Sequence, residues 1–73
     1  MDKLNEILED IRPDIDFDSA ESLVDGNILD SFDIITLVSR INEELGIEIS
    51  VEELIPENFN SKKAMEKLIE KYQ

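Results

Sequence analysis

Residues 30–46 read DSFDIITLVSRINEELG, and this stretch carries the strongest structural signal in the chain. Asp30 is a favourable N-cap residue, and Asp33 places a second carboxylate near the positive end of the helix dipole. Apolar side chains then recur at helical spacing, at Ile34, Leu37, Val38, Ile41 and Leu45. Gly46 follows as a natural helix terminator. The stretch therefore predicts an amphipathic helix over residues 31–45.

The flanking sequence predicts two further amphipathic helices. One is expected over residues 2–12, because Pro13 ends it and the apolar residues keep helical spacing at Leu4, Ile7, Leu8 and Ile11. Ser61 can cap a last helix over residues 62–72. The apolar stripe of that helix comprises Ala64, Met65, Leu68, Ile69 and Tyr72.

A short helix is expected between these longer ones. Ser50 and Glu53 stand three residues apart, as in the capping box that opens a helix. Pro56 is expected to end this helix after a turn or two. Residues 58–60 would then form a loop with one apolar anchor.

Residues 13–30 are long for a connection and rich in apolar side chains, namely Ile15, Phe17, Leu23, Val24, Ile28 and Leu29. Such a loop is expected to pack onto the core. The 73 residues are enough for a single domain, residues 1–73, and too few for two. The predicted fold is all-α: a small four-helix bundle of three main helices and one short helix, with a long loop between the first two.

The composition argues against an enzyme. The chain contains no cysteine and no histidine, so the usual nucleophile–base pairs and soft or imidazole metal ligands are absent. Carboxylate pairs such as Glu43 and Glu44 remain, but a bundle of this size suggests no adequate pocket. The lack of cysteine fits a cytoplasmic location. No apolar run approaches the roughly 20 residues that cross a bilayer, and nothing at the N-terminus resembles a signal peptide.

Charge defines the expected partners. Nineteen acidic residues against seven basic ones give a formal net charge of −12. Such a surface repels nucleic acid and anionic lipid and attracts basic protein surfaces. Asp14, Asp16 and Asp18 alternate as at the start of a calcium-binding loop, but Ser19 stands where that loop needs glycine. We therefore expect no metal site.

Residues 29–35, Leu-Asp-Ser-Phe-Asp-Ile-Ile, resemble the phosphopantetheine attachment motif of the acyl carrier protein family, in which Asp-Ser-Leu opens the second helix. The resemblance extends over essentially the whole chain, through its size, its helix order and its acidic second helix. It implies that a phosphopantetheinyl transferase moves 4′-phosphopantetheine from coenzyme A to Ser31. The thiol of that arm would carry an acyl or aminoacyl group as a thioester. Ser31 would be an attachment point, and the chain a carrier without catalysis of its own.

The same resemblance implies a docking surface for enzymes with basic faces, including ligases that activate acyl groups or amino acids and acyl-transfer enzymes. Its expected residues lie along the second helix and the short helix: Asp30, Phe32, Asp33, Thr36, Glu43, Glu44, Glu52 and Glu53. We expect the carrier to act as a monomer.

The cargo stays open between a fatty or polyketide acyl chain and an amino acid. Phe32 stands where leucine is commonest and looks like D-alanyl carrier proteins, which serve cell-wall teichoic acid D-alanylation; it also fits simple packing on the loop. Thr36 stands where typical fatty-acid carriers have glutamate. Residues 54–61 loosely resemble the acidic-then-aromatic segment of amino-acid-linked carriers. An acidic interaction module without a prosthetic group is the alternative outside the carrier class.

Overall fold

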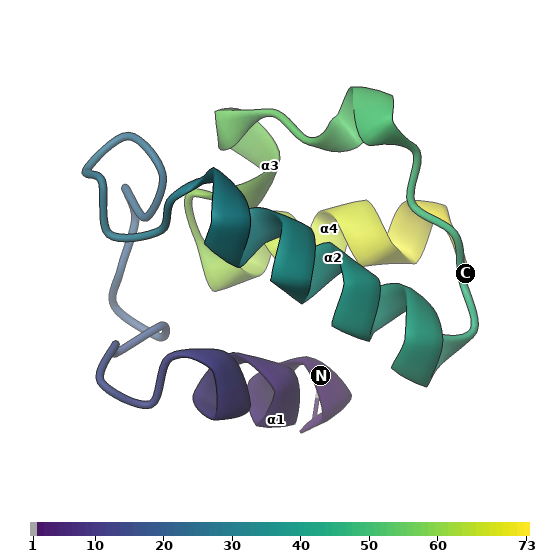
Figure 1. Ribbon diagram of the computed structural model, residues 1–73, viewed down its shortest axis with the longest axis horizontal. Helices are drawn as coiled ribbons and strands as arrows, with labels where there is room; N and C mark the ends of the chain where they lie inside the picture. Colours follow the sequence, from purple (N-terminus) through teal and green to yellow (C-terminus); the bar gives the residue numbers. More distant parts are fainter. Residues whose placement is uncertain (1) are drawn as a thin grey trace.

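The computed structural model describes residues 2–73, and the side chains from residue 3 onward. Its elements are α1 (Asp2–Ile11), α2 (Ser31–Leu45), the 3-10 turn η1 (Val51–Glu53), α3 (Pro56–Phe59) and α4 (Lys62–Lys71). In Figure 1, α2 runs between α1 and the segment that holds η1 and α3, with α4 behind it. The predicted all-α bundle of three main helices and one short helix is confirmed.

The core is entirely apolar within the described part of the chain. No polar or charged side chain in that part is buried. The buried side chains come from all four helices, the loop between α1 and α2, and residue 49: Leu4, Ile7, Leu8, Phe17, Leu23, Leu29, Ile34, Leu37, Val38, Ile41, Ile49, Phe59, Met65, Leu68 and Ile69. Burial of these side chains is the main source of stability in so small a fold.

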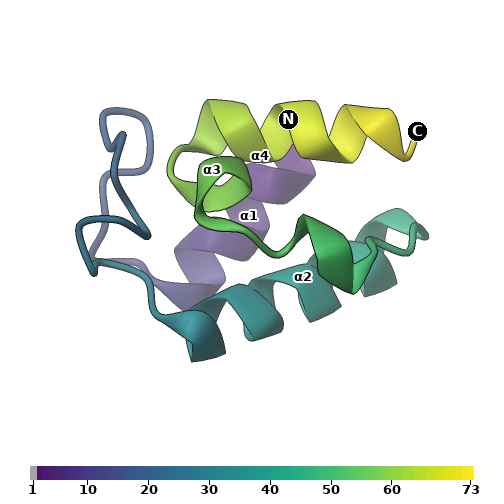
Figure 2. The same cartoon turned by 90° about the horizontal axis from the view of Figure 1, so that it is seen from above.

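The loop between α1 and α2, residues 12–30, belongs to this core as predicted. Phe17, Leu23 and Leu29 are buried, whereas Ile28 stays 42% exposed. The loop lies at one end of the bundle, beside the N-terminal end of α2 (Figure 2). It therefore delivers the chain to the start of α2 from a packed, ordered segment.

Local signals set the limits of α2, and the predicted bounds 31–45 are confirmed. Asp30 has extended backbone angles and acts as the N-cap, while Gly46 ends the helix with a φ of 66° in the left-handed region. Glycine adopts that region without the penalty that a Cβ atom brings. The predicted first and last helices are confirmed too, each ending one residue early, at Ile11 and Lys71.

The prediction for residues 50–60 is wrong in its details. Ser50 does accept a hydrogen bond, from the Glu52 N–H, but it opens only the 3-10 turn η1. Pro56 starts α3 instead of ending a helix, because proline lacks an N–H and suits the first helical position. The expected loop 58–60 therefore begins only after Phe59, which is fully buried.

Candidate functional site

Ser31 is the first residue of α2 and is exposed. A reciprocal capping box surrounds it: the Asp33 N–H donates to Asp30 Oδ1 at 2.9 Å, and the Asp30 N–H donates to Asp33 Oδ2 at 3.2 Å. The N–H groups of Ser31 and Phe32 make no hydrogen bond within the described residues. Free N–H groups and the positive dipole end make such a helix start favourable for a phosphate group.

The segment that leads to Ser31 is tied to Asn60, the residue that follows α3. The Leu23 N–H donates to the Asn60 carbonyl at 2.9 Å. The side-chain oxygen of Asn60 accepts the N–H groups of Val24 and Asp25, both at 3.0 Å. The sequence pattern did not single out Asn60, because its partners lie about 36 positions away along the chain.

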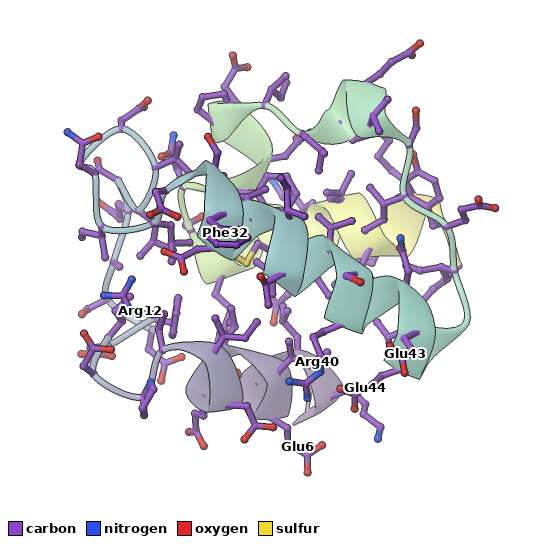
Figure 3. The ribbon with its side chains drawn as sticks, viewed as in Figure 1. Glu6, Arg12, Phe32, Arg40, Glu43 and Glu44 are labelled. Atoms are coloured by element: carbon purple, nitrogen blue, oxygen red, sulfur yellow. The ribbon has the colours of Figure 1, made fainter. Side chains whose placement is uncertain are left out.

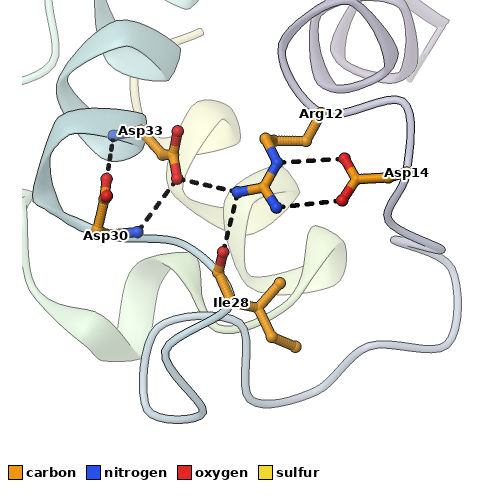
Figure 4. A network of polar contacts seen from close by, with 5 residues as sticks. All are labelled: Arg12, Asp14, Ile28, Asp30 and Asp33. Atoms are coloured by element: carbon orange, nitrogen blue, oxygen red, sulfur yellow. Dashed lines mark hydrogen bonds and ion pairs between the residues drawn. The ribbon is translucent and has the colours of Figure 1, made fainter.

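Arg12, the residue directly after α1, joins the start of α2 to the loop (Figure 4). Its Nη1 donates to the Ile28 carbonyl at 3.0 Å and to Asp33 Oδ2 at 3.2 Å, while Nε and Nη2 bind the Asp14 carboxylate at 3.2 Å each. The hydrogen bond from Arg12 lowers the pKa of Asp14, and the same contact raises the pKa of Arg12. Sequence reasoning missed this network as well.

A shallow, mainly apolar groove of about 160 Å³ lies beside Ser31, lined also by Ile34, Ile35 and Leu54. At the start of α2, two large apolar side chains face solvent: Phe32 is 76% exposed and Ile35 56%. Val51, on η1, is 79% exposed. Figure 3 places Phe32 at the N-terminal end of α2. The surroundings of Ser31 therefore combine carboxylates with exposed apolar surface. Ile35 does not belong to the apolar stripe of α2 in the sequence, and this position could have predicted its exposure.

The predicted docking residues on α2 fall into two environments. Thr36 and Glu43 are exposed, and Glu43 makes no ion pair within the described residues. Glu44 is engaged inside the chain, because Arg40 Nη2 binds Glu44 Oε2 at 2.7 Å and Lys3 lies 3.7 Å from its other oxygen. Figure 3 shows Arg40 and Glu44 together on the side of α2 that faces α1.

The predicted docking residues on η1 divide in the same way. Glu52 is exposed, whereas the Glu53 carboxylate accepts hydrogen bonds from Lys71 Nζ at 2.9 Å and from the Tyr72 hydroxyl at 3.2 Å. The hydrogen bond from Lys71 lowers the pKa of Glu53, against a smaller opposing effect of desolvation. Glu53 thus fastens η1 to the end of α4.

Residues 2–73 contain neither a cluster of metal ligands nor a helix able to span a membrane. Within that range, no group of three or more His, Cys, Asp or Glu side chains is arranged to hold a metal ion. No helix there is long and apolar enough to cross a membrane. The alternating aspartates of the loop are used otherwise, since Asp16 accepts the Ser19 hydroxyl at 2.9 Å and Asp18 pairs with Lys62.

Comparison with known proteins identifies the family. The model of the family described as "Phosphopantetheine attachment site" matches residues 2–68, nearly the whole chain. No curated protein and no solved structure gives a match. The exposed serine, the open helix start and the shallow groove fit the attachment of such a group. The chain therefore belongs to the phosphopantetheine-binding family of carrier proteins, which hold 4′-phosphopantetheine and work with other enzymes without catalysing a reaction themselves.

Proposed function

We propose that Ser31 is the attachment point of the 4′-phosphopantetheine arm. A phosphopantetheinyl transferase binds coenzyme A, and a base of that enzyme takes the Ser31 proton. The bond from Ser31 Oγ to phosphorus forms as the pyrophosphate bond of coenzyme A breaks, which releases the nucleotide half. The observation that carries the proposal is the exposure of Ser31 at the first turn of α2, beside two free N–H groups.

The arm supplies the thiol that the polypeptide lacks. The chain contains no cysteine and no histidine, so its own side chains offer no thioester chemistry. The terminal thiol of the arm carries the cargo as a thioester and presents it to successive enzymes. The role of the protein is to hold the arm at an accessible place and to be recognised.

Partner recognition, in this proposal, uses the expected docking residues that are exposed along α2 and η1. These are Asp30, Phe32, Thr36, Glu43 and Glu52. The other three expected docking residues form ion pairs within the chain: Asp33, Glu44 and Glu53. The exposed carboxylates attract basic partner surfaces and speed association, while Phe32 supplies apolar contact area. Because a cation of the chain already neutralises each of these three carboxylates, they attract a basic partner less than the exposed ones do.

The cargo we propose is an amino acid such as D-alanine, delivered by an amino-acid-activating ligase. Phe32 is typical of D-alanyl carriers, and Thr36 replaces the glutamate that typical fatty-acid carriers have. The groove of about 160 Å³ beside Ser31 is also small, since sites for larger ligands usually reach about 300 Å³ or more. A long acyl chain would find little cover there.

Intact-mass measurement tests the attachment site. The protein is incubated with coenzyme A, Mg²⁺ and a phosphopantetheinyl transferase of broad specificity. The wild type and Ser39→Ala should each gain one phosphopantetheinyl group, and Ser31→Ala should gain none. Ser39 is a matched control because it is exposed on the same helix. Labelling of Ser31→Ala to the wild-type extent would refute the assignment.

The cargo is tested on the modified protein. Parallel reactions contain ATP with either D-alanine and a D-alanine-activating ligase, or a long-chain fatty acid and an acyl carrier ligase. We expect the aminoacyl thioester to form with the higher kcat/KM, and Phe32→Leu with Thr36→Glu to narrow the difference. Faster charging with the fatty acid would contradict the amino-acid assignment and leave the Ser31 assignment intact.

A further inference from the structure

The guanidinium of Arg12 brings together three segments that are distant in sequence. It contacts Asp14 through two nitrogens, the Ile28 carbonyl near the end of the loop, and Asp33 in the first turn of α2 (Figure 4). The planar fork of arginine can make these contacts at once, whereas a lysine ammonium offers a single nitrogen. The contact with Ile28 spans 16 positions and that with Asp33 spans 21. Arg12 therefore holds both ends of the loop together.

The contact with Asp33 reaches the cap that surrounds Ser31. Asp33 Oδ2 accepts hydrogen bonds from both Arg12 Nη1 and the Asp30 N–H, at 3.2 Å each. The Asp33 N–H in turn donates to Asp30 Oδ1. The orientation of the Asp33 carboxylate is therefore fixed both by the Asp30 N–H and by Arg12. Ser31 lies between the two capping residues, directly inside this arrangement.

Arg12 also balances the charge at this end of α2. Asp14, Asp30 and Asp33 bring three carboxylates to one small region, and Arg12 is in contact with two of them. Like charges repel one another, so removal of the guanidinium favours the separation of the loop end from the first turn of α2. The capping box would remain, but it would no longer be fixed to α1.

We propose that Arg12 is a positioning residue for Ser31. It fixes residues 28–33 in one arrangement, so that the Ser31 hydroxyl meets the transferase in a single geometry. This inference rests on the proposed attachment of phosphopantetheine to Ser31. It assigns Arg12 no contact with the arm or with coenzyme A; its effect passes through Asp33 and the Ile28 carbonyl.

The chain offers a matched control in Arg40. Arg40 also joins α1 to α2 by a forked guanidinium, with Glu44 at 2.9 and 2.7 Å and Asp10 at 3.2 Å. Arg40→Gln and Arg12→Gln each remove one positive charge. Each also breaks an ion pair with α2 or within it and a contact to a residue in or just after α1. Only Arg12 touches the cap of the serine-bearing turn. A general effect of charge or of helix packing would affect both variants alike.

The test is the rate of phosphopantetheinyl transfer to each variant. Small misplacement of a reacting group lowers rates by up to about 100-fold, so we expect Arg12→Gln to lower kcat/KM by at least about ten-fold, mainly through kcat. Arg40→Gln should stay within about two-fold of the wild type. Arg12→Lys keeps the charge but not the fork, and should remain close to Arg12→Gln. Circular dichroism checks that every variant is folded. If Arg12→Gln does not fold, the rate of Arg12→Lys tests the inference in its place.

The possible results separate this inference from the proposed function. Full restoration of the rate by Arg12→Lys would overturn the positioning role, because charge alone would then suffice. Equal rates for Arg12→Gln and the wild type would overturn it as well, while the attachment at Ser31 would stand. With excess transferase, Arg12→Gln should still reach one group per chain. Failure of the wild type itself to gain any group would instead refute the proposed function.

Discussion

Replacing Leu23 with alanine tests whether the loop between α1 and α2 is a structural part of the core. Leu23 is fully buried, whereas Ile28 in the same loop is 42% exposed. Removing three carbon groups at about 0.8 kcal/mol each gives a loss of about 2.4 kcal/mol, before the cavity left behind is counted. Ile28→Ala should lose less than about 1 kcal/mol, because much of its side chain is already in water.

The expected loss is large against the stability of so small a domain. A core of this size supplies roughly 3–5 kcal/mol, so Leu23→Ala should leave at most about 0.6–2.6 kcal/mol. With a urea dependence of about 1 kcal/mol per molar, the unfolding midpoint should fall by about 2 M or more for Leu23→Ala and by less than about 1 M for Ile28→Ala. Circular dichroism during urea titration measures both. Equal shifts in the two variants would refute the packing argument.

Two further predictions concern single contacts. Lys71 holds the folded-state pKa of Glu53 below 4.5, so this ion pair stabilises the fold above about pH 4.5 and is lost as the pH falls. Glu53→Gln should therefore be less stable than the wild type near neutral pH, and urea midpoints should converge in acid; a constant difference would contradict this. Gly46→Ala should lose about 1 kcal/mol through backbone strain alone, because φ is 66° and no atom lies within 4 Å of the added Cβ. An unchanged midpoint would show that the turn relaxes freely.

The parts of the fold that depend on neighbouring residues were predictable from the sequence. Asp30 and Gly46 mark the ends of α2, because caps and left-handed glycines act within a turn of their own position. The start of α3 was not predicted, since Pro56 is compatible both with the end of one helix and with the first residue of the next.

The candidate site shows the same division. The neighbours of Ser31 in sequence led to the prediction that it is the attachment point, and the structure places it exposed at the start of α2. The contacts of Arg12 and Asn60 were not predictable, because their partners come close only when the chain folds. For the same reason the sequence could not reveal that Glu44 and Glu53 are paired inside the chain.

The exposed apolar side chains at the start of α2 and on η1 have a consequence for colloidal behaviour. Phe32, Ile35 and Val51 remain largely in contact with water, and such exposed apolar surface favours self-association of the protein. The net charge of −12 opposes that contact by mutual repulsion. Concentrated preparations should therefore be clear near neutrality and turn cloudy as acid removes the charge.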